Sequence, residues 1–229
     1  FAFTLIACLL AIPALRWLPA PDNSGVTKGG QKLVDNPPSS LFLRLFMASY
    51  FCAGVGFVVS ATFIVAIINH LPGMAGEGPK VFLAIGIGAA PACISWDFIA
   101  RRIGELNALI AAAVLQIIGI LVPVTVDGLI PTIFAALLFG STFVGMVSLV
   151  LTMAGRYYPT KPAKMMGKMT LSYGVAQVLA PALTGWLATR SGAYASGLWL
   201  AAGIMCIGVG LLVSLKFVET NNNQELAKA

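Results

Sequence analysis

The sequence predicts an all-α membrane protein, a bundle of six transmembrane helices preceded by part of one more helix. Two observations predict this class. The composition is 59% hydrophobic and only 10% charged, and the mean hydropathy is +0.91, whereas a soluble domain carries about 25% charged residues. Long apolar runs recur along the chain, and none alternates with the period of two that a transmembrane β-strand requires. The bilayer must therefore be the solvent for most of the chain.

The first predicted element, residues 1–18, is interpreted as the end of a truncated transmembrane helix. It opens without a methionine, a charged region or a cleavage site, which argues against a signal peptide. Arg16 and Trp17 close it with residues that anchor a membrane interface. A linker rich in Pro, Gly, Ser and Asn follows over 19–40, and we expect it to be flexible and aqueous.

Six apolar segments then form a predicted transmembrane domain over 41–218, followed by a tail over 219–229. Each is close to or above the roughly 20 residues that cross a bilayer. The first would be about 43 Å long as a helix, so it must tilt or protrude. Pro79 suits the first turn of the second segment, and Pro91 lies inside it. The predicted boundaries are 41–69, 79–97, 105–124, 129–157, 163–189 and 194–217.

Charge predicts the orientation of these segments. Of the 14 Lys and Arg residues, all except Lys80 and Arg190 fall on the side of the linker. Cytoplasmic loops carry an excess of Lys and Arg, so the linker and the C-terminus are predicted to be cytoplasmic.

The remaining composition gives little support to metal, nucleic-acid or redox chemistry. The net charge of +6 sits in short breaks rather than on a basic helix face, so we expect no nucleic acid as partner. Cys8, Cys52, Cys93 and Cys206 lie far apart in apolar runs and are interpreted as packing residues. The single histidine, His70, ends an apolar run and is interpreted as interfacial rather than catalytic. We expect no metal and no cofactor.

Small and polar side chains at i, i+4, i+7 and i+11 form one narrow face on each of three segments. Such a face is either a close helix-packing seam or a water-accessible path. The spacing leaves both open on the first and fourth segments, whereas the bulk of Tyr173 and Gln177 favours a cavity on the fifth. The candidate substrate-path residues are Ser49 and Ser60; Ser141, Ser148 and Thr152; and Tyr173, Gln177 and Thr184. No acid lies in mid-segment, so this part of the chain offers no proton site.

The loop after the second segment reads SWDFIARRIGELNAL. Asp97 and Arg101 are at i, i+4, which permits an ion pair on a helix end, and Gly104 permits a turn. Ordinary positive-inside loop charge also accounts for these residues.

At these residues the chain resembles the major facilitator superfamily. Asp97, Arg101, Arg102 and Gly104 are similar to the acidic–basic–glycine loop motif of that family, although the Asp-to-basic spacing is longer and Glu105 replaces a usual basic residue. The run LAPALTGWLA, with Pro181 and Gly185, resembles the eleventh helix of the family. The stretch RYYPTKPAKMMGKMTLSYGVAQVLAPALTGWL, with GFVVSATFIVAI, resembles the YbfB-like branch of bacterial transporters.

The resemblance implies the C-terminal half of a twelve-helix secondary transporter in the bacterial inner membrane. It implies alternating access, with a small solute, the lipid bilayer and the missing N-terminal half as partners. The resemblance leaves open whether a proton is coupled to the movement of the solute. The four loop residues would form a conformational latch. The first and fourth helices of each half would line the cavity, with the second and fifth beside it.

Two other classes of function are weighed against transport. A scaffold or receptor can use the same fold. An intramembrane enzyme needs a nucleophile and a base, and His70 is the only base for neutral pH. We therefore expect transport without covalent chemistry. The hydroxyl and amide side chains of the candidate path bind many classes of solute, so they do not identify the substrate.

Overall fold

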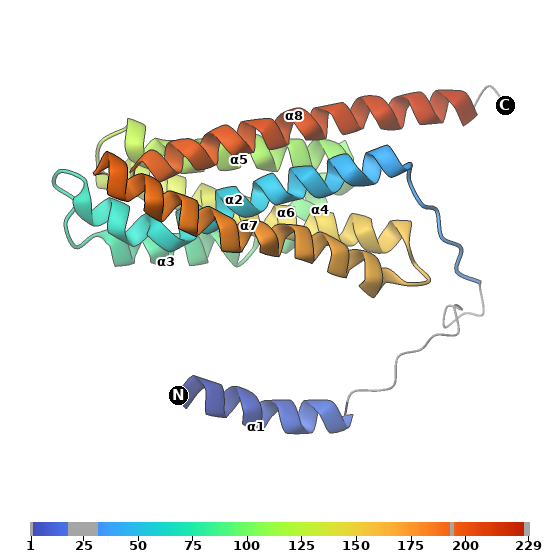
Figure 1. The fold of residues 1–229 in the computed structure, drawn as a ribbon, viewed down its shortest axis with the longest axis horizontal. Coiled ribbons are helices and arrows are strands. Elements are labelled where there is room, and N and C mark those ends of the chain that lie inside the picture. The colour runs from blue at the N-terminus through green and yellow to red at the C-terminus, as the bar shows by residue number, and fades with distance from the viewer. Residues whose placement is uncertain (1, 18–31, 193–194, 227–229) are drawn as a thin grey trace.

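The computed structural model describes residues 2–17, 32–192 and 195–226. Every element in these ranges is a helix (Figure 1). Residues 19–31 of the predicted linker and residues 227–229 of the predicted tail lie outside the described residues. The helices are α1 (Ala2–Trp17), α2 (Ser40–His70), α3 (Gly78–Ala89), α4 (Ala92–Ile103), α5 (Glu105–Thr125), α6 (Leu129–Tyr157), α7 (Pro162–Ser191) and α8 (Ala195–Leu226).

The apolar runs coincide with these helices, with two differences. The predicted segment 79–97 is divided into α3 and α4, which meet at an angle of 47°. The break falls at Pro91, because proline has no backbone N–H to donate within the helix and its ring clashes with the preceding turn. The helix then runs on to Ile103 and stops at Gly104, whose φ of +88° suits glycine. α8 continues past the predicted end at Phe217 to Leu226.

Four helices, α2, α5, α6 and the described apolar part of α8, are long and apolar enough to cross a membrane. The bent pair α3–α4 makes a fifth candidate span. α7 is not among them, although it is 30 residues long. Its middle carries Ser172, Tyr173 and Gln177 among its apolar residues, and these lower its hydropathy. The chain is thus a multi-pass membrane protein in which α7 is the most polar long helix of the bundle.

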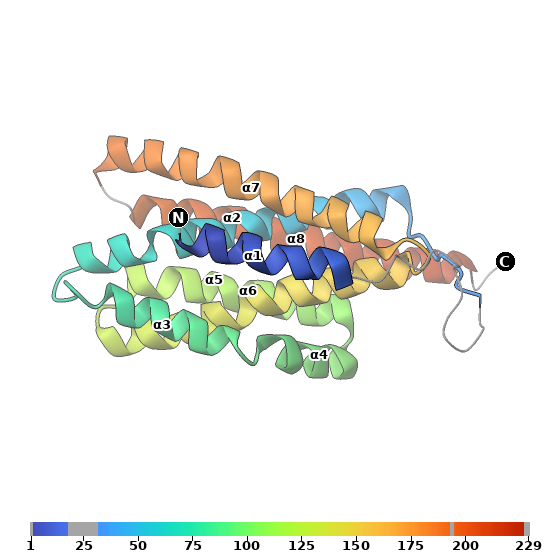
Figure 2. The same ribbon diagram turned by 90° about the horizontal axis from the view of Figure 1, so that it is seen from below.

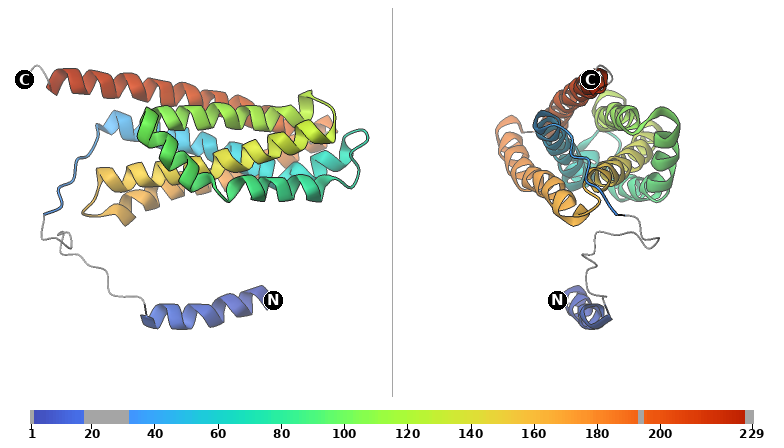
Figure 3. Two further views of the ribbon diagram at one scale, coloured as in Figure 1. Left: turned by 180° about the vertical axis from the view of Figure 1, so that it is seen from behind. Right: turned by 90° about the vertical axis from the view of Figure 1, so that its right-hand side faces the viewer.

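The bundle is built around α2 and α6. α2 packs against α8, α7 and α3, and α6 packs against α5, α3 and α4. Figure 2 shows α7 along one side of the bundle and α3–α4 along the other. α1 makes no contact with another described helix and stands apart from the bundle (Figures 1 and 3). We call the end where residues 32–39 enter α2 the linker end, and the end with His70 the far end.

Residues 32–39 are fastened to the loop between α6 and α7. The Asp35 carboxylate accepts hydrogen bonds from the Thr160 backbone N–H at 3.0 Å and from the Thr160 hydroxyl at 2.7 Å. The Asn36 N–H donates to the Tyr157 carbonyl at 3.1 Å. The two bonds from Thr160, with a smaller contribution from Lys161, hold the pKa of Asp35 below its ordinary value. The carboxylate therefore stays charged at neutral pH, and its attachment is lost only when the pH falls through this lowered pKa.

Glycines bring α3 and α6 into backbone contact. A Cβ on Gly88 would collide with the Leu137 carbonyl, and a Cβ on Gly140 would collide with the Ile85 carbonyl. Both partners are backbone atoms, which cannot turn away as a side chain can. The two helices can approach this closely only because both positions lack a side chain.

We predict that Gly88→Ala lowers the unfolding midpoint of the purified protein, because the added methyl group forces α3 and α6 apart at a cost of about 1–3 kcal/mol. Gly86→Ala on the same helix is the matched control, since a Cβ there meets no atom within 4 Å. It should leave the midpoint unchanged or raise it. Equal midpoints for the two variants would contradict the α3–α6 backbone contact.

Candidate functional site

An aromatic cluster joins the three helices α2, α6 and α7. The ring centroids of Tyr50 and Tyr173 lie 4.7 Å apart, and those of Phe57 and Tyr173 lie 6.0 Å apart. Phe57 also stacks on Phe143 at 4.6 Å, and Phe143 contacts Phe139 at 5.6 Å. Phe57, Phe143 and Tyr173 are half-buried, so this cluster forms part of the accessible surface between the helices.

Of these residues, sequence reasoning identified only Tyr173. The other aromatic residues do carry a periodic signal. Tyr50 and Phe57 are at i, i+7 on α2, and Phe139 and Phe143 are at i, i+4 on α6, which places each pair on one helix face. Hydroxyl and amide spacing alone could not reveal this signal, because phenylalanine has no polar atom.

The stripe on α2 lies against α8 and α5. The Ser49 hydroxyl donates to the Phe46 carbonyl at 2.9 Å, and a Cβ on Gly208 of α8 would lie 3.6 Å from the Ser49 carbonyl oxygen. A Cβ on Gly56, in the same stripe, would meet Met205 of α8. These are the contacts of a helix-packing seam.

Ser60 and Thr184 are both buried, and their hydroxyls have no partner among the described residues. Ser60 lines an internal cavity of about 10 Å³, together with Gly119 and Pro123 of α5. That space holds at most a single water molecule, so no solute fits there. Thr184 packs so closely on α8 that a Cβ at Gly197 would collide with its methyl group.

On α6, the predicted stripe meets α4 at one end. The Ser141 carbonyl accepts a hydrogen bond from the Trp96 indole at 3.0 Å, and the Ser141 hydroxyl donates to the Leu138 carbonyl at 2.8 Å. The Trp96 ring also covers Gly145. Ser148 is half-buried and Thr152 is exposed. The stripe therefore passes from a seam with α4 to an accessible surface.

Gln177 is exposed, and it lies on an open flank of α7. Thr170, Gly174, Gln177, Pro181 and Gly185 are spaced by four, three, four and four residues, which places them on one side of the helix. A Cβ built on Gly174 or Gly185 would meet nothing within 4 Å. We call these five residues the open flank of α7.

Asp97, Arg101 and Arg102, expected in a loop, lie on the last turns of α4, and only Gly104 separates α4 from α5. The Arg101 Nε donates to the Asp97 carboxylate at 2.9 Å, so this ion pair is confirmed. The Arg102 guanidinium lies over the Phe98 ring, 4.3 Å from its centroid. Glu105, at the start of α5, pairs with Arg156 at the end of α6. This pair joins the start of α5 to the end of α6, and sequence spacing could not show it.

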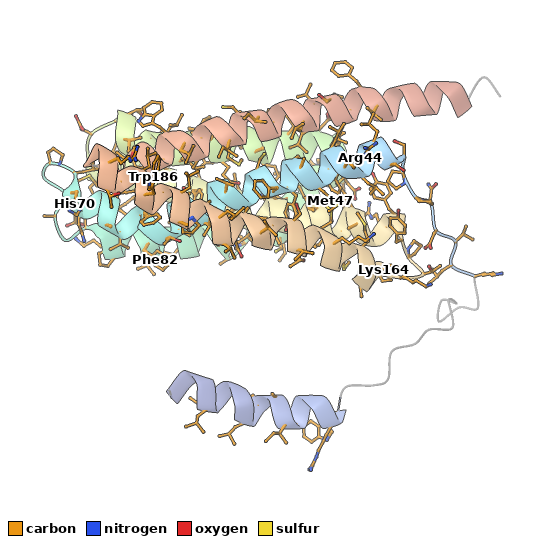
Figure 4. The ribbon with its side chains drawn as sticks, viewed as in Figure 1. Arg44, Met47, His70, Phe82, Lys164 and Trp186 are labelled. Atoms are coloured by element: carbon orange, nitrogen blue, oxygen red, sulfur yellow. The ribbon has the colours of Figure 1, made fainter. Side chains whose placement is uncertain are left out.

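Within the described ranges, no group of three or more His, Cys, Asp or Glu side chains could hold a metal ion. His70 lies exposed at the end of α2 (Figure 4), with Nδ1 2.7 Å from the Ala66 carbonyl oxygen.

The family described as "Uncharacterised MFS-type transporter YbfB" matches residues 1–213 of the chain. This match covers all of the helices described above except the end of α8. No curated protein matches the chain closely enough to count as a relative.

We predict a measurable coupling between Phe57 and Phe143 in a double-mutant cycle with Phe57→Leu and Phe143→Leu. Stacked aromatic pairs contribute about 0.5–1.5 kcal/mol beyond their buried area, so the double variant should lose less stability than the two single variants together. The free energy of unfolding in detergent measures this. A parallel cycle of Phe57→Leu with Phe134→Leu, an exposed residue of α6, should show no coupling. Equal coupling in both cycles would contradict a specific contact.

Proposed function

The chain belongs to the YbfB-like branch of the MFS transporters, and we propose that it moves a small solute across the membrane by alternating access. The family match over residues 1–213 carries this proposal. The helical, multi-pass architecture supports it. Transport of this kind makes and breaks no covalent bond, so it needs contacts for a solute and a movable wall rather than a nucleophile and a base.

We place the solute path beside the open flank of α7 and the aromatic cluster. Gln177 is one turn from Tyr173, so an amide and a phenol ring lie near each other on α7. Ser148 and Thr152 contribute hydroxyls from α6. An amide in contact with hydrocarbon leaves its donors and acceptor without partners, at a cost of several kcal/mol. Water, a solute or another helix must therefore face Gln177.

We propose that a second helical bundle of the transporter faces this flank and supplies the other wall of the path. The described bundle would then be one half with six spans: α2, the bent pair α3–α4, α5, α6, α7 and α8. In this arrangement α7 crosses the membrane with its polar flank turned away from lipid, which is why it can be less apolar than the other spans.

The linker end is proposed to be cytoplasmic. Most cations of the described chain gather there, including Arg44, Arg101, Arg102, Arg156 and Lys164, whereas Lys80 and Arg190 lie at the far end. Lys and Arg are retained on the cytoplasmic side of short loops.

We predict that Gln177→Cys in the full-length transporter, with the native cysteines replaced, reacts with a membrane-impermeant maleimide. A thiol in a watery path can ionise and react, whereas a thiol in lipid cannot. Leu179→Cys is the matched control, because Leu179 is 57% exposed and lies about 160° round the helix from Gln177, on the side opposite the flank. It should stay unlabelled.

Thr160→Cys, on the loop at the linker end, marks sidedness in the same experiment and should react only from the cytoplasmic side. Absence of labelling at Gln177→Cys from either side, in a protein that folds normally, would mean that the α7 flank is a packing seam. Labelling of Leu179→Cys to the same extent would show that exposure alone determines reactivity.

If a second bundle packs against this flank, Gly174→Leu should lower stability only when that bundle is present. In the present chain the variant should unfold at the same temperature as the parent, because nothing lies within 4 Å of a Cβ at this position. In the full-length transporter the unfolding midpoint should fall, because the larger side chain would separate the two bundles. Leu179→Phe, on the opposite side of α7, should change neither midpoint. An unchanged midpoint for full-length Gly174→Leu would exclude close packing against this flank.

A further inference from the structure

A pocket of about 460 Å³ opens at the linker end, between the beginnings of α2 and α7. Four cations line it. Arg44 comes from α2, Lys164 and Lys168 come from α7, and Lys161 directly precedes α7. Figure 4 shows Arg44 and Lys164 at this end of the bundle, with Met47 one turn further along α2. The pocket thus gathers basic side chains from two helices and a loop.

The one acid in the lining cannot neutralise these cations. Asp35 is already bound by Thr160 through two hydrogen bonds, and a single carboxylate faces four positive groups. The ion pairs that the structure shows between described residues involve none of the four cations; they are Lys80–Glu77, Arg101–Asp97 and Arg156–Glu105. The pocket therefore carries an excess of positive charge.

The start of α7 adds to this charge. The helix begins at Pro162, and its N-cap residue, Lys161, forms no side-chain cap hydrogen bond. The positive end of the helix dipole is therefore not offset by a capping oxygen. Together with the lysines, this favours an anionic group in the pocket.

An apolar groove of about 320 Å³ continues from the pocket between α2 and α7. Met47 and Lys168 line both spaces. Phe51 forms the α2 wall of the groove, and Leu171 and Val175 form the α7 wall. Since Phe51 and Leu171 lie one turn beyond Met47 and Lys168, and Val175 lies two turns beyond Lys168, the groove leads from the charged end toward the membrane interior.

The groove has a defined floor and a defined end. At its floor, the Ser172 hydroxyl donates to the Met47 carbonyl at 2.8 Å, so this hydroxyl is already satisfied by α2. Beyond it, a Cβ on Gly54 would lie 2.9 Å from the Ala176 Cβ, so α2 and α7 are in contact there. The two helices therefore diverge toward the linker end and leave a wedge-shaped space.

We propose that this pocket and groove bind an anionic phospholipid, with its phosphate among the four cations and an acyl chain along the groove. A free phosphate would use the cations but not the groove. A zwitterionic lipid would use the groove but bring a cation of its own into a pocket that already has an excess of them. Basic pockets between transmembrane helices at the membrane surface suit acidic lipid headgroups.

Native mass spectrometry of the purified chain from mixed micelles tests the proposal, with phosphatidylglycerol, phosphatidylcholine and inorganic phosphate as probes. Phosphatidylglycerol should be retained in preference to phosphatidylcholine. Lys164→Gln should weaken its retention about fivefold, the effect of one lysine near an anionic headgroup. Lys32→Gln removes the same charge at the same end outside the pocket, and it should have no such effect. An unfolding midpoint equal to that of the parent shows that each variant is folded.

A second pair of variants tests the groove. Val175→Trp fills it and should lower phosphatidylglycerol retention, whereas Val178→Trp, on the same helix but outside the groove, should not. Equal retention of the two lipids would overturn the proposal. Displacement of phosphatidylglycerol by millimolar inorganic phosphate, or retention unaffected by Val175→Trp, would show a site for free anions and would also overturn it.

Discussion

The absence of hydrogen-bond partners in hydrocarbon is the constraint on which this structure depends. A segment in lipid must satisfy its own backbone groups, so each apolar run becomes a helix. The same constraint acts on the side chains. Ser49, Thr142 and Ser214 donate to carbonyls three or four residues earlier in their own helices, so each hydroxyl is satisfied within its own helix. Where proline interrupts the ladder, at Pro91, the span bends into two helices.

This constraint explains why the element boundaries were largely predictable. The ends of α5, α6 and α7 lie within two residues of the predicted ones, because apolar length is itself the physical cause of the span. The bend between α3 and α4 was less predictable. Pro91 marked its place, but proline is tolerated inside many membrane helices. The continuation to Ile103 depended on Gly104, whose positive φ ends the helix beyond the apolar run.

The candidate site was less predictable, because the same residues build seams and paths. A small polar face lets two backbones approach, and it also admits water. Only the partner across the face distinguishes the two cases. Gly56 meets Met205 and Gly145 meets Trp96, so these stripes pack. Gly174 meets nothing, and Gln177 beside it is exposed. Periodicity within one helix contains no information about the helix opposite.

α7 shows how these demands combine in one element. Its buried face packs on α2 through Ala176, its flank with Gln177 is open, and its exposed apolar side contains Leu171 and Leu179. A helix with three such faces cannot have the uniform hydropathy of α2. Its position in the membrane must then depend on what contacts each face: α2, a watery or protein neighbour, and lipid. An element stabilised by its neighbours rather than by its own hydropathy can move when those neighbours change, and the proposed alternating access would change them, because one bundle rocks against the other.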